Sequence, residues 1–176
     1  MRRRTVLKGA GLGIVAALGA GFWALPTSPR PAAISLEGAR QVLDDLRGRA
    51  LASISGWSPG EVFNHCAQSI EYSMDGYPEL KPAWFRHSLG PAAFAVFSAR
   101  GGMRHPLNEA IPGASPLTEP ASEAQALQRL QAAFERFARH QGELQPHFAY
   151  GELDHAEYAE AHVMHLYNHL SLIRLA

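Results

Sequence analysis

The stretch "SPGEVFNHCAQSIEYSMDG", residues 58–76, decides the fold class. Ser58 and Glu61 have the spacing of a capping box, and Pro59 stands at the first helical position, where its missing N–H is not needed. Apolar residues then recur every three or four positions until Gly76, which is a typical helix terminator. This pattern predicts an amphipathic helix that ends just before Gly76.

Three further helices are predicted from the same kind of signal. Ser122 and Gln125 have the spacing of a second capping box, and Asp154 precedes a first turn that carries Glu157. Another helix is expected to begin after Ser35. The four helices are expected near residues 36–52, 59–75, 122–141 and 154–174.

The segment between the second and third helices is long and irregular. It contains one or two short helices that we expect to break at Gly90-Pro91, followed by a loop rich in turn residues. Strand-like alternation is almost absent from the chain. The fold class predicted is therefore all-α: a four-helix bundle with a long irregular connection between bundle helices 2 and 3.

The N-terminal segment, residues 1–33, has the layout of an export signal rather than of a folded element. Arg3 and Arg4 precede a weakly apolar run, an arrangement that resembles the twin-arginine (Tat) signal. A plain secretory signal and a retained N-terminal anchor are the alternatives, and no cleavage point is marked. A Pro-rich tether then leads into the domain expected over residues 34–176.

These features predict export through the twin-arginine translocation machinery. The protein would then be periplasmic or anchored to the outer face of the cytoplasmic membrane, with membrane contact only through its N-terminal segment. Basic and acidic residues balance at sixteen each, but residues 1–33 hold five of the basic ones and no acid. The body is therefore about five charges negative, which argues against a nucleic-acid partner. Its one cysteine, Cys66, excludes an intramolecular disulfide.

Histidines are crowded in "AEAHVMHLYNHL", residues 159–170, which holds His162, His165 and His169. His165 and His169 are four residues apart, so on a helix their rings lie one turn apart on the same face. Such a pair is a common metal chelate, because imidazole nitrogens from neighbouring turns can reach one ion. His65 lies at the edge of the apolar stripe of the second helix and is a possible third ligand. From spacing alone, a packing role for His65 is equally consistent.

The chain over residues 35–175 resembles the DinB-like (YfiT-like) four-helix-bundle superfamily, and within it the domain-of-unknown-function 1569 family. The stretches that carry the resemblance are "WSPGEVFNHCAQSIEYSMDGYP", "IPGASPL" and "PHFAYGELDHAEYAEAHVMHLYNHL". The family's usual ending resembles H-L-D-H-H-L, whereas this chain has Tyr167 and Asn168 at the two central positions. The resemblance implies that His65, His165 and His169 together bind one divalent metal ion. Zinc, nickel, iron and copper all accept imidazole ligands, so the metal stays open.

Three histidines with an open fourth position are what a catalytic metal site requires. We therefore expect an exported protein that binds one metal ion. The first hypothesis for its function is a metal-dependent hydrolase or transferase that acts on a small molecule. The alternative is a non-catalytic module that binds a metal, a small ligand or a partner. The third hypothesis is a purely structural bundle. The oligomeric state stays open, and a dimer is compatible with the sequence. Residues expected to orient the ligands are Glu61, Asn64, Ser69, Tyr72 and Glu160. Of the other histidines, His162 is expected to support the site and His147 to lie near its mouth, whereas surface or turn positions are expected for His87, His105 and His140.

Overall fold

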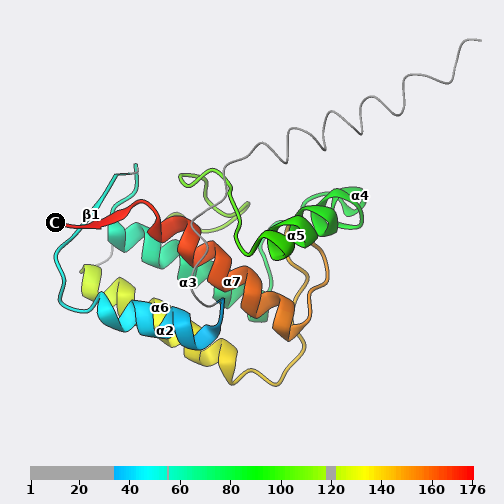
Figure 1. Cartoon of the computed structure of the whole chain (residues 1–176). Helices are drawn as coiled ribbons and strands as arrows, with labels where there is room; N and C mark the ends of the chain where they lie inside the picture. The colour runs from blue at the N-terminus through cyan, green and yellow to red at the C-terminus, as the bar shows by residue number, and fades with distance from the viewer. Residues whose placement is uncertain (1–33, 55, 118–121) are drawn as a thin grey trace, which may run out of the picture.

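The computed structural model describes residues 34–54, 56–117 and 122–176 (Figure 1). This part of the chain is mainly helical, in agreement with the expected all-α class. The predicted export signal lies outside the described residues. Among the helices that are described, none combines the length and the apolar character needed to cross a bilayer.

The chain forms helices of very different length, joined by irregular segments (Figure 1). The helices are α2 (Leu36–Asp45), α3 (Pro59–Asp75), α4 (Ala83–Arg86), α5 (Leu89–Arg100), α6 (Glu123–Ala138) and α7 (His155–Leu170). Two short strands, β1 (Leu51–Ser53) and β2 (Ile173–Leu175), pair with each other. α4 and α5 lie within the long connection between α3 and α6, where one or two short helices were expected.

Local capping signals set the helix ends as the sequence indicates. The Ser58 hydroxyl accepts a hydrogen bond from the Glu61 N–H at 3.2 Å, and the Glu61 carboxylate accepts one from the Ser58 N–H at 2.7 Å. Asp154 and Glu157 form the same reciprocal pair at the start of α7. Gly76 ends α3 with a φ of 104°, a conformation that favours glycine. Both histidine-bearing helices are thus fixed at their N-termini by their own sequence.

The two strands correct the predicted ends of the first and last helices. α2 stops at Asp45 and α7 at Leu170, well before the expected residues 52 and 174. Gly48, with a φ of 66°, lies three residues beyond the end of α2 in a conformation that a continuing helix does not contain. The residues beyond the two helices then pair antiparallel, with Ser53 opposite Ile173. This pairing joins segments some 120 residues apart, so it depends on the helices already lying side by side.

The short helices of the connection do not break where the sequence suggested. The break falls at His87 and Ser88, and Gly90 and Pro91 lie inside the first turn of α5. Proline is tolerated there because its missing N–H would have no partner within the helix. Gly90 has a packing role instead, since a Cβ on it would lie 1.9 Å from the carbonyl oxygen of Ala149. The glycine thereby lets α5 approach the loop before α7.

The larger hydrophobic core holds α2, α3, α6 and α7 together. α6 packs along α3, and α2 and α7 complete the layers around the same apolar cluster (Figure 1). The largest fully buried side chains include Phe63, Phe134, Phe137, Leu130, Leu166 and Tyr158. Burying a large apolar side chain contributes roughly 1.5–3 kcal/mol, so this cluster is the main source of stability. It brings α3 and α7 together, which places His65 opposite the histidines of α7.

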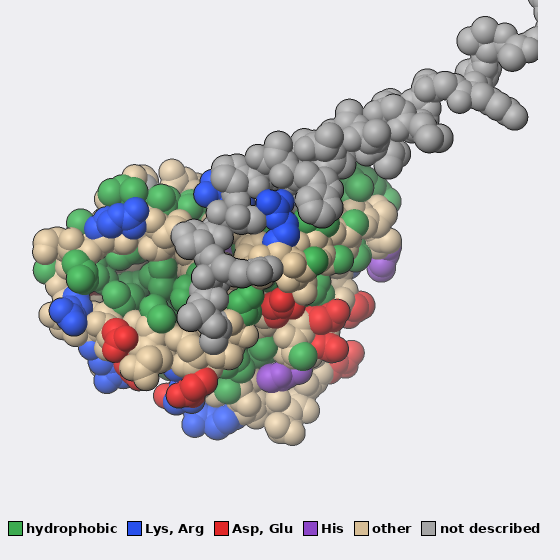
Figure 2. All heavy atoms as spheres, viewed as in Figure 1, with side chains coloured by type: hydrophobic (Ala, Val, Ile, Leu, Met, Phe, Trp, Pro, Cys, Tyr) green, Lys and Arg blue, Asp and Glu red, His purple; other side chains and the backbone are tan. Residues whose placement is uncertain are grey.

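A second, smaller cluster positions the connection against α7. Phe94 of α5 and Met103 beyond it pack on Ala161 and Met164 of α7. The segment after α5 is therefore held beside the same helix that carries the paired histidines. On the face shown in Figure 2, the described basic side chains are scattered among acidic and apolar ones.

Candidate metal centre

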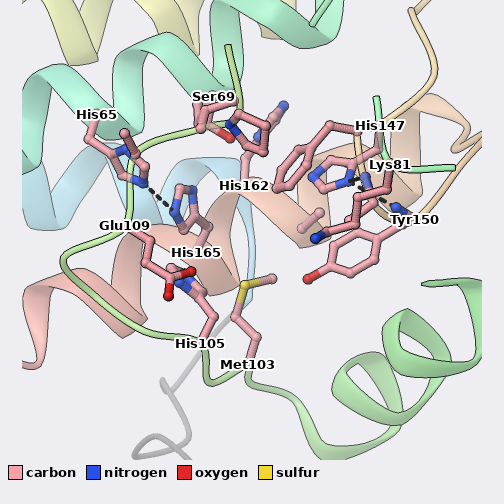
Figure 3. Close-up of a pocket in the computed structure, with 16 residues that line it drawn as sticks. His65, Ser69, Lys81, Met103, His105, Glu109, His147, Tyr150, His162 and His165 are labelled. Atoms are coloured by element: carbon pink, nitrogen blue, oxygen red, sulfur yellow. Dashed lines mark hydrogen bonds between the residues drawn. The ribbon is translucent and has the colours of Figure 1, made fainter. Parts of the chain in front are cut away.

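The structure brings together the three histidines that the sequence suggested as ligands. The Nε2 atom of His165 lies 3.2 Å from Nε2 of His65 and 3.0 Å from Nε2 of His169. One ring nitrogen from each of the three lies within 4.8 Å of those of the other two. His65 comes from α3 and the other two from α7, so helix packing assembles the triad. Figure 3 shows His65 and His165 facing each other.

The spacing of these nitrogens suits a single metal ion. Tetrahedral zinc has Zn–N bonds of about 2.0–2.1 Å, which places two bound nitrogens roughly 3.3 Å apart. The 3.0 and 3.2 Å separations around His165 are close to this value. The ligand nitrogens of His65 and His169 also lie within 4.8 Å of each other. The donor set of three imidazoles also suits nickel, iron and copper.

Burial keeps the three rings neutral, as ligation requires. Desolvation, reinforced by the neighbouring histidines, lowers the pKa of His65 to about 4 and that of His169 to about 2. The same causes hold the pKa of His165 well below its usual value. All three therefore offer a free nitrogen lone pair at neutral pH, without the proton release that charged histidines would need.

Trp57 covers one side of the triad. Its ring centre lies 4.9 Å from that of His65, and it stacks on His169 at 6.1 Å with an interplanar angle of 7°. An indole over two ligand rings restricts their orientation and displaces water from one side of the site. Access to the triad must therefore come from another direction.

Three of the five residues expected to orient the ligands have other partners. Glu61 is used in the helix cap, Asn64 accepts a hydrogen bond from Arg129 at 3.1 Å, and Glu160 accepts one from Ser98 at 2.9 Å. The Nδ1 atom of His65 is buried without a hydrogen-bond partner among the described residues. His65 thus lacks the carboxylate or carbonyl support that metal-bound histidines usually have.

His162 lies near the triad but has a structural role. Its Nε2 is 3.1 Å from the hydroxyl of Ser73, and that hydroxyl donates its own proton to the Ile70 carbonyl at 2.7 Å. Because the hydroxyl has only one proton, His162 must be the donor of the first bond. Desolvation lowers the pKa of His162 to about 3, so the ring stays neutral. It anchors α7 to α3 and is absent from the ligand set.

His105 is the residue that the sequence did not reveal. A surface or turn position was expected, yet its ring centre lies 5.0 Å from that of His165 and 5.1 Å from that of His169. The long connection carries it there, because the chain after α5 is packed against α7. No spacing within the sequence relates His105 to the paired histidines, so local pattern had no means of finding it.

A cavity of about 250 Å³ opens beside the triad (Figure 3). Near the triad the cavity is bordered by His65, His165 and His105. Its other end is bordered by His147 and Tyr150, from the loop before α7. His147 was expected near the mouth of the site, and it does contribute to the wall. Its Nδ1 accepts hydrogen bonds from the N–H groups of Ala149 and Tyr150, both at 3.1 Å. The proton of His147 is therefore on Nε2.

Comparison with known proteins places the chain in a family without assigning it an activity. No curated protein and no solved structure gives a significant match to it. The model of a protein family does match, and it spans residues 33–175, which include both histidine-bearing helices and the whole connection between them. The chain thus belongs to the family described as Protein of unknown function (DUF1569).

Proposed function

We propose that this protein binds one divalent metal ion through His65, His165 and His169, and that the ion acts on a small molecule held in the adjoining cavity. The observation that carries the proposal is the convergence of three neutral Nε2 atoms, 3.0 and 3.2 Å apart around His165, with His65 and His165 on the wall of that cavity. Since three protein ligands leave one position of a tetrahedral ion open, the arrangement is that of a reactive rather than a closed site.

The class of reaction proposed is metal-dependent hydrolysis or group transfer. A bound divalent ion in such a site polarises a substrate oxygen or lowers the pKa of a bound water. The chain itself supplies the rest. Trp57 excludes water from one side, and the Nε2–H of His147 can donate to a substrate group. The cavity of about 250 Å³ suits a small molecule better than a polymer.

Export and the wider fold relationship belong to the same proposal. Arg3, Arg4 and the apolar run that follows them support the twin-arginine route and a location in the periplasm or on the outer face of the cytoplasmic membrane. The packing of α2, α3, α6 and α7 around one core supports the relationship to DinB-like bundles. The translocation machinery and an unidentified small molecule are the partners proposed, and membrane contact would be limited to the N-terminal segment.

Metal content provides the direct test of the site. Purified protein is loaded with zinc or nickel, freed of excess metal and analysed by mass spectrometry. The parent should retain about one ion per chain, and His65→Ala, His165→Ala and His169→Ala should each retain far less. His87→Ala is the matched control, because His87 is exposed and lies outside the site. Equal metal content in all five proteins would refute the site.

Activity assays separate the enzyme from the binding module. The loaded protein is screened against ester, amide and phosphoester substrates, with and without chelator, and with thiol nucleophiles as acceptors for transfer. Turnover that chelator abolishes supports the enzyme. Metal-dependent binding of a small molecule without turnover would favour the non-catalytic module instead.

A further inference from the structure

His105 is held in one tautomer at the edge of the triad. Its Nδ1 lies 2.8 Å from the carbonyl oxygen of Pro106, and a carbonyl oxygen can only accept a hydrogen bond. Nδ1 therefore carries the ring proton. With the single proton of the neutral imidazole on Nδ1, Nε2 presents a lone pair and acts only as an acceptor.

That lone pair is buried and unsatisfied. Among the described residues, none makes a hydrogen bond with the His105 Nε2, and the atom is shielded from solvent. Buried polar atoms without a partner are uncommon in native proteins, and each calls for an explanation such as a water or a ligand that completes it. A group with a proton to donate must therefore be the natural neighbour of this atom.

The position of His105 suggests which group that is. Its ring contacts those of His165 and His169, and it borders the cavity together with His65 and His165 (Figure 3). His105 is not among the residues whose ligand atoms lie within 4.8 Å of one another. It therefore stands just beyond ligand distance, on the side where the cavity meets the triad. This is where a molecule on the fourth coordination position would lie.

We propose that Nε2 of His105 accepts a hydrogen bond from the molecule on the fourth coordination position, so that the site selects a protic oxygen ligand. Water, hydroxide or the hydroxyl group of a substrate would satisfy both the ion and His105. An aprotic anion such as azide would instead place its own lone pairs against that of Nε2. The inference rests on the proposed metal site and adds the class of ligand that the site prefers.

The test uses cobalt as the metal and azide as the aprotic probe. Cobalt-loaded parent, His105→Phe, His105→Gln and the control His87→Phe are titrated with azide while the visible absorption of the ion is followed. His105→Phe keeps a ring of similar size but removes the acceptor, so azide should bind about 10-fold more tightly or better. His105→Gln can present either its amide oxygen or its NH2 group, so it should also bind azide more tightly than the parent, whereas the control should resemble the parent.

The outcomes separate the role of His105 from the metal site itself. Equal azide affinity in parent and His105→Phe would overturn the role of His105 and leave the metal site standing. Loss of cobalt from a folded His105→Phe would make His105 a direct ligand and would equally overturn the role. A parent that binds no cobalt would overturn the metal site and this inference together. Circular dichroism checks folding, and His105→Leu replaces the Phe variant if that variant unfolds.

Discussion

The metal-free protein should lose stability in mild acid, at a pH where most carboxylates are still ionised. Six histidines have pKa values lowered by burial: His65, His105, His147, His162, His165 and His169. In the unfolded chain each would titrate near the ordinary value of about 6.5. Below that pH the unfolded state binds more protons than the native state, so the free energy of unfolding falls as pH falls.

Three of these histidines allow the size of the effect to be worked out. The native pKa values are about 4 for His65, about 3 for His162 and about 2 for His169. At pH 5 each unfolded histidine is almost fully protonated and each native one almost fully neutral, which lowers the free energy of unfolding by about 2 kcal/mol per residue. Together they remove about 6 kcal/mol, and the other three act in the same direction. A domain of this size has only about 5–15 kcal/mol of stability, so unfolding is expected between pH 6 and pH 4.5.

The assay is urea unfolding of the chelator-treated protein, followed by circular dichroism at a series of pH values from 7.5 to 5. His162→Gln is the informative variant, because Gln can still donate to Ser73 but does not titrate. Its free energy of unfolding should depend on pH less steeply than that of the parent, by about 1.4 kcal/mol per pH unit below 6.5. His87→Gln, at an exposed position, is the surface control. A parent whose stability changes by less than about 1 kcal/mol across this range would refute the reasoning.

Further expectations concern the metal, the packing and the export of the protein. Metal loaded at neutral pH should be retained to about pH 5, lower than ordinary histidine ligands allow, because desolvation lowers the pKa of His65 to about 4. The metal content of the loaded protein after dialysis at several pH values measures this, and loss of the metal already at about pH 6.5 would contradict it. Saturating metal should raise the melting temperature of the parent, and a variant with all three ligands replaced by alanine should show no such rise in calorimetry. Gly90→Ala should lower the free energy of unfolding by about 2 kcal/mol or more, because its Cβ would meet the Ala149 carbonyl oxygen at 1.9 Å. Denaturant unfolding at neutral pH tests this, and an unchanged free energy of unfolding would mean that α5 shifts without cost. Replacing Arg3 and Arg4 by Lys should leave the protein in the cytoplasm, as cell fractionation would show, and undiminished export would indicate the ordinary secretory route.

The sequence by itself determined the elements whose signals are local. The starts of α3 and α7 follow from Ser58 with Glu61 and from Asp154 with Glu157, because capping depends on residues three positions apart. The shared face of His165 and His169 follows from helical periodicity in the same way. Resemblance to a known superfamily, rather than periodicity, pointed to His65 as their partner.

Only the tertiary structure decided which distant residues meet. The pairing of β1 with β2 and the arrival of His105 beside the triad both join segments far apart in the chain, so no local pattern encodes them. Gly90 was interpreted as a helix breaker, but its position is explained by contact with a loop some 60 residues later. Caps and periodicity act over one or two helical turns, whereas the site depends on how α3, α7 and the connection pack around the shared core. Burial in that packing also sets the charge of the histidines, which their sequence neighbours alone do not determine.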